Sequence, residues 1–159
     1  MILENLKIFS QNIRKNNFII KMILEAHSDF NIIFIQEPSW LFICSILYYD
    51  NYEDNLLMGI VNHPNWLIFT RKPVSSNDLP WVAIFVNIRL LSLCFSLRKD
   101  VINHRDILLL SFLNNGDSFW IMNVYSDSSH STIKYLKDTK LNIRNLLIMT
   151  GDFNIRNSL

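Results

Sequence analysis

Short runs of apolar residues, each ending in a polar side chain, constrain the fold of this chain more than any other feature. The clearest run is Ile-Ile-Phe-Ile at 32–35, which is followed directly by Gln36-Glu37-Pro38. Four β-branched and aromatic residues are too few for a helix and are typical of a strand that is buried on both faces. An alternating segment from Leu6 to Ile13 precedes it and predicts another strand. The strand at 32–35 would deliver the carboxylate of Glu37 at its C-terminal end.

A helix is predicted between these two strands, over Phe18–Ala26, with Asn16 or Asn17 as its N-cap. Strand, helix and strand then form a β-α-β unit. The residues expected on the inward face of the helix are Phe18, Ile19, Met22, Ile23 and Ala26.

The remainder of the chain predicts mostly antiparallel strands. The candidate strands are Trp66 to Thr70, Trp81 to Leu90, Leu91 to Leu97, Ile107 to Leu113 and Phe119 to Tyr125. Residues 114–117, Asn-Asn-Gly-Asp, have the composition of a hairpin turn. A helix is expected from caps at 127–131 to about Leu141, and a buried strand at Asn145–Met149 leads into Thr150-Gly-Asp-Phe-Asn154.

Composition limits the class of protein. With 159 residues, the chain is expected to form one domain, residues 1–159, and 50% hydrophobic residues with 18% charged residues exclude a disordered chain. Its longest apolar stretch, Ile32 to Tyr49, is interrupted at 36–38, so no transmembrane helix is expected. Glu4 and Lys7 argue against a secretory signal. The isolated Cys44 and Cys94 predict reduced thiols in an intracellular protein.

Nucleic-acid binding is not predicted from total charge, because 15 basic and 14 acidic residues give a net charge of only +1. Basic residues nevertheless lie at the ends of apolar runs, where loops would gather them at one rim of a sheet. These residues are Arg14, Lys15, Arg71, Lys72, Arg98, Lys99 and Arg105. They are candidates for phosphate contacts, and the alternative is that they solubilise the strand ends.

Two familiar catalytic classes are excluded by their missing residues. His104-Arg105-Asp106 and Asp152-Phe153-Asn154 occur in the order of protein-kinase motifs, but no glycine loop is present and Phe85 occupies the position of the phosphate-binding lysine. The nucleophile elbow of serine hydrolases, Gly-x-Ser-x-Gly, is also absent.

Polar groups of a different kind follow the predicted strands. Asn12 and Glu37 offer oxygen ligands of the type that Mg²⁺ binds, since this cation takes one or two carboxylates and completes its shell with water and phosphate. Phosphodiester hydrolysis also needs a carboxylate for water and neutral donors for the phosphate oxygens. Asp152, Asn154 and Tyr125 are the right chemical types for these tasks.

The order of these motifs resembles the endonuclease/exonuclease/phosphatase superfamily. The motifs are Gln-Asn at 11–12, Gln-Glu-Pro at 36–38, Asn-Val-Tyr at 123–125 and Gly-Asp-Phe-Asn at 151–154. Longer phrases resemble the endonuclease of non-LTR retrotransposons, in particular those of fungal repeat elements: Phe95–Asp100, Asn103–Asp106, Asn123–Asp127, Tyr135–Asp138 and Gly151–Arg156. The resemblance runs from about Leu6 to the last residue. It implies a four-layer α/β sandwich, in which two packed mixed or antiparallel sheets have helices outside.

The resemblance also implies roles for individual residues. Glu37 would be a metal ligand with Asn12 beside it, and Asp152 would position or activate the water. Asn154 would bind the scissile phosphate, while Tyr125 and Asn123 would contact or support the phosphate site. The cofactor would be Mg²⁺, for which Mn²⁺ can substitute.

This chain departs from the family pattern in two ways. No proline follows the tyrosine motif at Tyr125-Ser-Asp127. In addition, family members continue through further strands to a Ser-Asp-His motif, which this sequence does not contain after residues 151–154. We therefore expect only the N-terminal portion of the sandwich, with exposed strand edges and apolar surface. We also expect the chain alone to be almost inactive.

Two functions remain open at this point. One is Mg²⁺-dependent phosphodiester hydrolysis on DNA by a retrotransposon-type endonuclease. The other is a non-catalytic remnant or nucleic-acid-binding module that retains the fold. The resemblance implies DNA as partner and no membrane, and a reverse transcriptase region in a full-length element. An intracellular location is expected, and the nucleus is compatible with a DNA substrate. The sequence does not indicate an oligomeric state.

Overall fold

The computed structural model describes residues 5–26, 29–46, 57–60, 63–71, 73, 75, 77–142 and 144–154. Its helices are α1 (Asn17–Ala26) and α2 (Ser131–Asp138), with short 3-10 segments η2 (Trp40–Phe42) and η3 (Ile88–Leu93). The strands are β1 (Ile8–Asn12), β2 (Ile32–Gln36), β3 (Ile43–Ile46), β4 (Leu57–Ile60), β5 (Trp66–Phe69), β6 (Val82–Asn87), β7 (Ser96–Leu97), β8 (Ile107–Asn114), β9 (Asp117–Tyr125) and β10 (Leu146–Asp152).

These strands form two mixed sheets. The larger sheet has six strands in the order β1-β2-β6-β5-β4-β3, and the smaller has four in the order β10-β9-β8-β7. β1 and β2 are parallel and are joined by α1, which confirms the predicted β-α-β unit. β10 is parallel to β9, whereas the β8–β9 pair is antiparallel.

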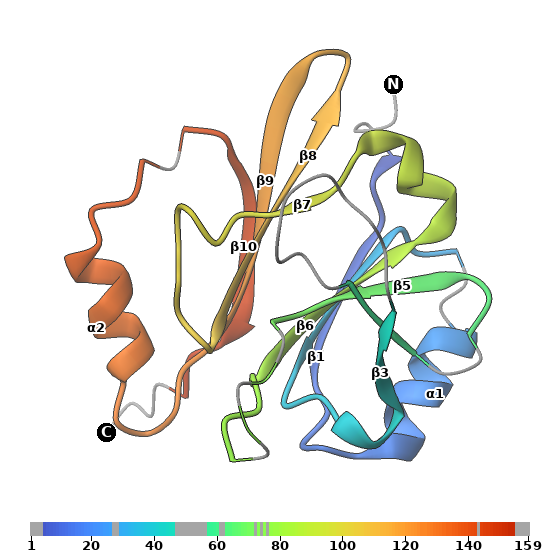
Figure 1. Ribbon diagram of the computed structural model, residues 1–159, viewed down its shortest axis with the longest axis horizontal. Coiled ribbons are helices and arrows are strands. Elements are labelled where there is room, and N and C mark those ends of the chain that lie inside the picture. The colour runs from blue at the N-terminus through green and yellow to red at the C-terminus, as the bar shows by residue number, and fades with distance from the viewer. Residues whose placement is uncertain are drawn as a thin grey trace.

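The two sheets pack face to face between the two helices, so that the fold has four layers (Figure 1). One core cluster joins the sheets through residues such as Phe34, Ile84 and Phe112. A second packs α1 against the outer face of the six-stranded sheet, and a third packs α2 against the four-stranded sheet. This arrangement confirms the α/β sandwich expected from the sequence.

β2 shows why a continuous apolar run was required. Ile32 and Phe34 face the neighbouring sheet, whereas Ile33 and Ile35 face α1. Every residue of the strand is buried because both faces are covered. Its C-terminal end, which carries Gln36 and then Glu37, therefore has a fixed position in the sandwich.

Local signals at turns and caps were predicted correctly. Asn16 caps α1, since its Oδ1 accepts hydrogen bonds from the amides of Phe18 and Ile19. The β8–β9 hairpin closes through Asn115 and Gly116, whose φ angles of 54° and 88° are those of a type I′ turn.

Other expectations were wrong. The buried face of α1 consists of Ile20, Ile23 and Leu24, while Phe18 and Met22 are 70% and 52% exposed. Residues 91–97 do not form one strand, because η3 continues to Leu93 and only Ser96–Leu97 pair with β8.

The predicted burial of the last strand was also wrong. β10 alternates, and Leu147 and Met149 are each about half exposed, because the strand lies at the edge of its sheet in the described part of the chain. β3 and β4 were not predicted from the sequence. Among the helices that the structure describes, none has the length and apolar composition needed to cross a membrane.

Candidate functional site

A cluster of polar side chains lies where β1 and β2 of one sheet end beside β10 of the other. The Asn12 amide nitrogen donates to Glu37 Oε1 at 2.9 Å and to Asp152 Oδ2 at 2.6 Å. The Asn12 Oδ1 accepts from the Arg14 amide at 2.9 Å, which orients the side chain. One carboxamide therefore holds two carboxylates that are 115 residues apart in sequence.

Glu37 is held by backbone contacts on both sides. Its amide donates to the carbonyl of Trp81 at 2.8 Å, and its carbonyl accepts from the Lys15 amide at 2.8 Å. Its φ is 51°, a left-handed conformation that a residue with a Cβ adopts at a cost of about 1–3 kcal/mol. Arg14, Lys15 and Asn154 also have positive φ values, so backbone strain is concentrated around this cluster.

Asp152 and Asn154 form the β10 side of the site. Asp152 Oδ1 accepts from the Asn154 amide at 3.0 Å, and the Asn154 side-chain nitrogen donates to the carbonyl of Ser126 at 2.7 Å. Gly151 lets β10 approach β9, because a Cβ at this position would overlap the carbonyl of Val124. The glycine of the Gly-Asp-Phe-Asn motif thus lets β10 lie close to β9, and this sets the position of the Asp152 carboxylate.

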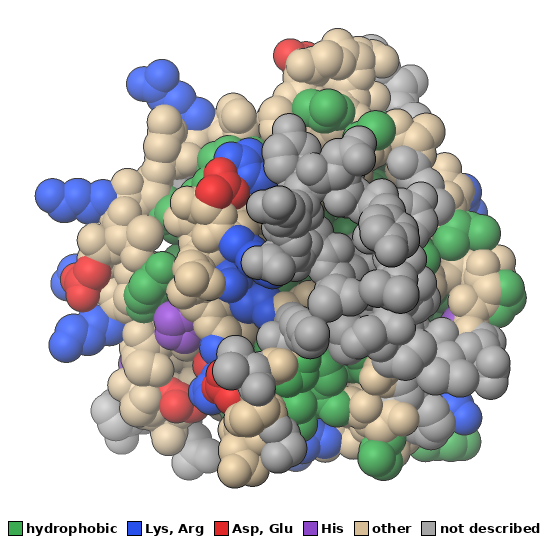
Figure 2. Space-filling view, in the orientation of Figure 1, with side chains coloured by type: hydrophobic (Ala, Val, Ile, Leu, Met, Phe, Trp, Pro, Cys, Tyr) green, Lys and Arg blue, Asp and Glu red, His purple; other side chains and the backbone are tan. Residues whose placement is uncertain are grey.

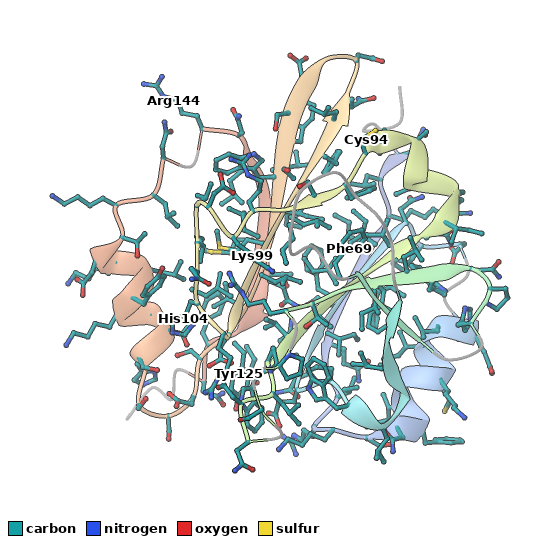
Figure 3. All side chains as sticks on the ribbon, in the orientation of Figure 1. Phe69, Cys94, Lys99, His104, Tyr125 and Arg144 are labelled. Atoms are coloured by element: carbon teal, nitrogen blue, oxygen red, sulfur yellow. The ribbon has the colours of Figure 1, made fainter. Side chains whose placement is uncertain are left out.

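Tyr125 ends β9 at the same edge (Figure 3). Its ring stacks on Trp81, with centroids 5.2 Å apart and planes at 11°. Burial, followed by the negative charges of Glu37, Asp152, Asp127 and Asp106, raises the pKa of the Tyr125 phenol above its usual value. The hydroxyl therefore keeps its proton at neutral pH and is available as a hydrogen-bond donor.

Asn123 has a supporting role rather than the phosphate contact considered from the sequence. It is completely buried, and its amide nitrogen donates to the carbonyls of Ile35 and Ala83, both at 2.9 Å. Its Oδ1 accepts from Gln36 Nε2 at 2.6 Å. All these bonds cross between the two sheets, so Asn123 fixes the position of β9, and with it Tyr125, relative to β2.

The basic candidates are distributed unevenly. Arg14 and Lys15 are exposed next to Asn12, and the Lys15 ammonium lies 4.1 Å from the Trp81 ring centroid. Arg98 pairs with Asp100 at 2.6 Å, and Arg105 pairs with both Asp78 and Asp106. Lys99 lies in the turn after β7, and Lys72 lies outside the described residues.

Arg71 is a correction to the sequence analysis. Its side chain is buried and donates to the carbonyls of Ile102 and Ile107 and to Asn103 Oδ1. Burial lowers its pKa from the ordinary arginine value. The guanidinium holds the loop before β8 in place. Its Nε, Nη1 and Nη2 atoms each donate to a protein oxygen rather than to a phosphate.

Several residues near the site were missed in the sequence. Trp81 was assigned only to a strand, although it contacts both Lys15 and Tyr125, and Trp40 lies in the pocket beside Glu37. The available signal was a tryptophan shortly after a proline, in Pro38-Ser-Trp40 and in Pro80-Trp81. Exposed Lys134 and Lys137 lie on α2 and Lys140 follows it, and basic side chains gather at the left edge of the molecule in Figure 2.

The donor set fits a hard divalent cation. Glu37 and Asp152 share one amide, and neither carboxylate has an ion-pair partner within the part of the chain that the structure describes. Among those residues there is also no group of three His, Cys, Asp or Glu side chains that could hold a metal. Two carboxylates with solvent access suit Mg²⁺, which retains water ligands, better than a zinc site with four protein ligands. Asn12 supplies its nitrogen to the carboxylates, which makes it an organiser of the ligands.

The fold is that of an endonuclease domain of a non-LTR retrotransposon: two mixed sheets between outer helices. Among solved structures, the chain is similar to the endonuclease domain of TRAS1, a telomere-specific non-LTR retrotransposon, with a TM-score of 0.59 and 15% sequence identity. The similarity covers 92% of this chain and 58% of that chain, so this chain spans less than two thirds of the matched structure. No family model and no curated protein sequence matches this chain.

Proposed function

We propose that this chain carries the metal-binding part of a nuclease active site and that its reaction is hydrolysis of phosphodiester bonds in DNA. Mg²⁺ is the proposed cofactor, and Mn²⁺ can replace it. The observation that carries the proposal is the Asn12 amide, which holds Glu37 and Asp152 together at the end of both sheets. The similarity to a retrotransposon endonuclease domain supports DNA as the substrate class.

The residues divide the chemistry as follows. When bound at Glu37, Mg²⁺ supplies positive charge to the phosphate as negative charge develops there. Asp152 orients the attacking water and accepts its proton. One N–H of the Asn154 amide is occupied by Ser126, and the second donates to a phosphate oxygen together with the Tyr125 hydroxyl.

A plasmid-nicking assay tests this function. It compares the 159-residue chain with the same chain joined to a C-terminal segment of family length, because the similarity covers only 58% of the matched structure. We expect Mg²⁺-dependent nicking by the extended chain, loss of nicking in EDTA and a decrease of roughly 10²-fold or more in Asp152→Asn or Asn154→Ala. The short chain should be far less active, because members of a catalytic unit act together.

The exposed Asp138→Asn, at the C-terminal end of α2, serves as the matched control, because it makes the same carboxylate-to-amide change outside the polar cluster. Nicking that survives Asp152→Asn in either chain would overturn the assignment of the site. An extended chain that binds DNA but never cuts it would instead support a nucleic-acid-binding module.

A further inference from the structure

A pocket of about 410 Å³ opens beside Glu37, and its lining includes Glu37 but not Asp152. We infer that this pocket binds an unpaired nucleobase of the nucleic-acid substrate. The inference rests on the proposed function and extends it from the scissile phosphate to a neighbouring nucleotide. We call the site the aromatic pocket. Its apolar wall consists of Pro38, Trp40, Leu41, Leu79, Pro80 and Trp81.

The shape and chemistry of the aromatic pocket suit a flat, partly polar ligand. Its volume lies within the range of small-molecule sites, about 300–1,000 Å³. Two indole rings and two proline rings are the kind of surface on which nucleobases stack without regard to sequence. Asn17 lines the same pocket, and its Oδ1 has no hydrogen-bond partner within the described residues. The wall therefore includes one polar carboxamide beside its apolar residues.

The pocket is continuous with the catalytic cluster. Glu37 belongs to its wall, and the adjacent Trp81 accepts the Glu37 amide through its carbonyl while stacking on Tyr125. A polynucleotide with its phosphate at Glu37 and Tyr125 would thus place a neighbouring sugar and base at the mouth of the aromatic pocket.

A base could enter the aromatic pocket by displacing the Lys15 side chain from Trp81. Tyr125 covers one face of the Trp81 ring, and the exposed Lys15 ammonium covers the other at 4.1 Å. Base–aromatic stacking is generally stronger than an exposed cation–π contact. We expect a base to take the place of Lys15 on the indole, and the released ammonium then pairs with a phosphate of the same strand.

The pocket is preformed rather than collapsed. Trp40 is anchored by its indole N–H, which donates to the Pro80 carbonyl at 3.1 Å. Leu41, which also lines the pocket, is 81% exposed and therefore accessible to a ligand. A base must leave its stack in a duplex to reach these rings, so the pocket favours single-stranded or unpaired DNA over paired DNA.

The test measures binding by the 159-residue chain, so it does not depend on turnover. Fluorescence anisotropy would compare a 12-nucleotide single strand with an abasic strand that has the same number of phosphates. We expect the strand with bases to bind about tenfold more tightly, with quenching of tryptophan emission. Trp81→Leu should remove most of this advantage and leave the abasic strand almost unaffected. Leu41→Asp, at an exposed position that should tolerate substitution, should weaken the base-dependent part as well.

Trp120→Leu is the matched control, because Trp120 is another partly buried tryptophan that lies on β9 away from the pocket, under Arg98. It should retain the preference for bases. Equal affinity for the two strands, binding of neither, or an unchanged preference in both Trp81→Leu and Leu41→Asp would overturn the aromatic pocket as a base site. The nuclease proposal is judged separately, by metal-dependent nicking and its loss in Asp152→Asn.

Discussion

At the scale of single residues, two asparagines determine the geometry of the site in different ways. Asn12 lies among the charged groups and holds both carboxylates. Asn123 is out of contact with solvent and joins β9 to β2 and β6. The same residue type therefore serves ligand organisation in one case and sheet docking in the other.

Asn123→Ala should destabilise the fold by about 2–4 kcal/mol. The substitution removes three hydrogen bonds that cross between the two sheets and leaves a cavity at a completely buried position. Urea unfolding followed by circular dichroism measures the effect. The exposed Asn142→Ala is the control, and a loss below about 1 kcal/mol for Asn123→Ala would contradict the role assigned to this side chain.

Metal affinity should depend on both carboxylates of the site. Glu37→Gln removes the proposed anionic ligand and should weaken Mg²⁺ and Mn²⁺ binding by roughly tenfold or more. Asp152→Asn removes a neighbouring negative charge and should weaken binding by a smaller factor. Binding by the wild-type chain should itself be weak, because two carboxylates displace few waters from Mg²⁺. Calorimetric titration, or NMR shifts of the Asn12 side chain, measures the affinity. An unchanged affinity in both variants would place the metal elsewhere.

At the scale of elements, the loop between β7 and β8 connects the core to the site. Arg71 donates hydrogen bonds to this loop. The His104 ring packs on Tyr135 of α2, with ring centroids 4.8 Å apart (Figure 3). The Asp106 amide donates to His104 Nδ1, and the Asp106 carbonyl accepts from the Tyr125 amide. The loop thus supports the end of β9.

Acidification should loosen this loop through His104. Burial lowers the pKa of the imidazole below its usual 6.5; Asp106 opposes the shift, and Arg105 and Arg71 add to it. The unfolded chain then takes up a proton before the folded chain does, so stability is full above about pH 6.5 and decreases as the pH falls below it. Protonation would also remove the acceptor for the Asp106 amide.

Thermal unfolding between pH 7.5 and 5 measures this contribution. His104→Asn keeps a nearby acceptor but does not titrate, so its melting temperature should decrease less with acidification than that of the wild type. His130→Asn, which changes an exposed histidine, controls for the loss of an imidazole. A parallel decrease in wild type and His104→Asn would show that other groups cause the pH dependence.

The sequence predicted those elements whose signals are local. The apolar run at 32–35, the Asn16 cap and the Asn115-Gly116 turn each depend on neighbouring residues, and each was confirmed. The inward face of α1 was wrong because tertiary packing selects among apolar positions all round a helix that is mostly hydrophobic. β3 and β4 were not predicted; each has only four residues, and they pair with each other and, through β4, with β5.

The site was predicted in part for a related reason. Motif order placed Asn12, Glu37, Tyr125 and Asp152 at strand ends, and the structure brings these ends together. The contributions of Trp81 and Arg71 depend on contacts across the fold, which residue type alone does not show. The catalytic, metal-binding and phosphate-binding roles of the site residues remain predictions.

At the scale of the whole molecule, the charged surface is uneven although the net charge is only +1. Arg98 and Arg105 are paired with acidic side chains, whereas Arg14 and Lys15 are exposed beside the polar cluster of Asn12, Glu37 and Asp152. Phosphate contacts of this kind position a strand without reading its sequence.

DNA affinity should therefore fall steeply with salt and differ little between unrelated sequences. Replacing Arg14 and Lys15 together with alanine should reduce the slope of log affinity against log salt by about 1 per charge. Arg98→Ala should reduce it less, because Asp100 already neutralises that guanidinium. Anisotropy titrations from low to moderate salt measure the slopes. A sequence preference that persists at high salt would contradict this mode of binding.

The bond between Asn12 and Asp152 joins side chains from two different sheets, and Thr150 and Ser10 make another such bond at 2.8 Å. The arrangement of the two carboxylates therefore depends on the correct packing of one sheet against the other. A compact state that retained its strands but lost close packing would keep its far-ultraviolet spectrum and still lose its metal affinity. Cation binding by this chain would report tertiary order, a property that secondary-structure spectroscopy does not detect.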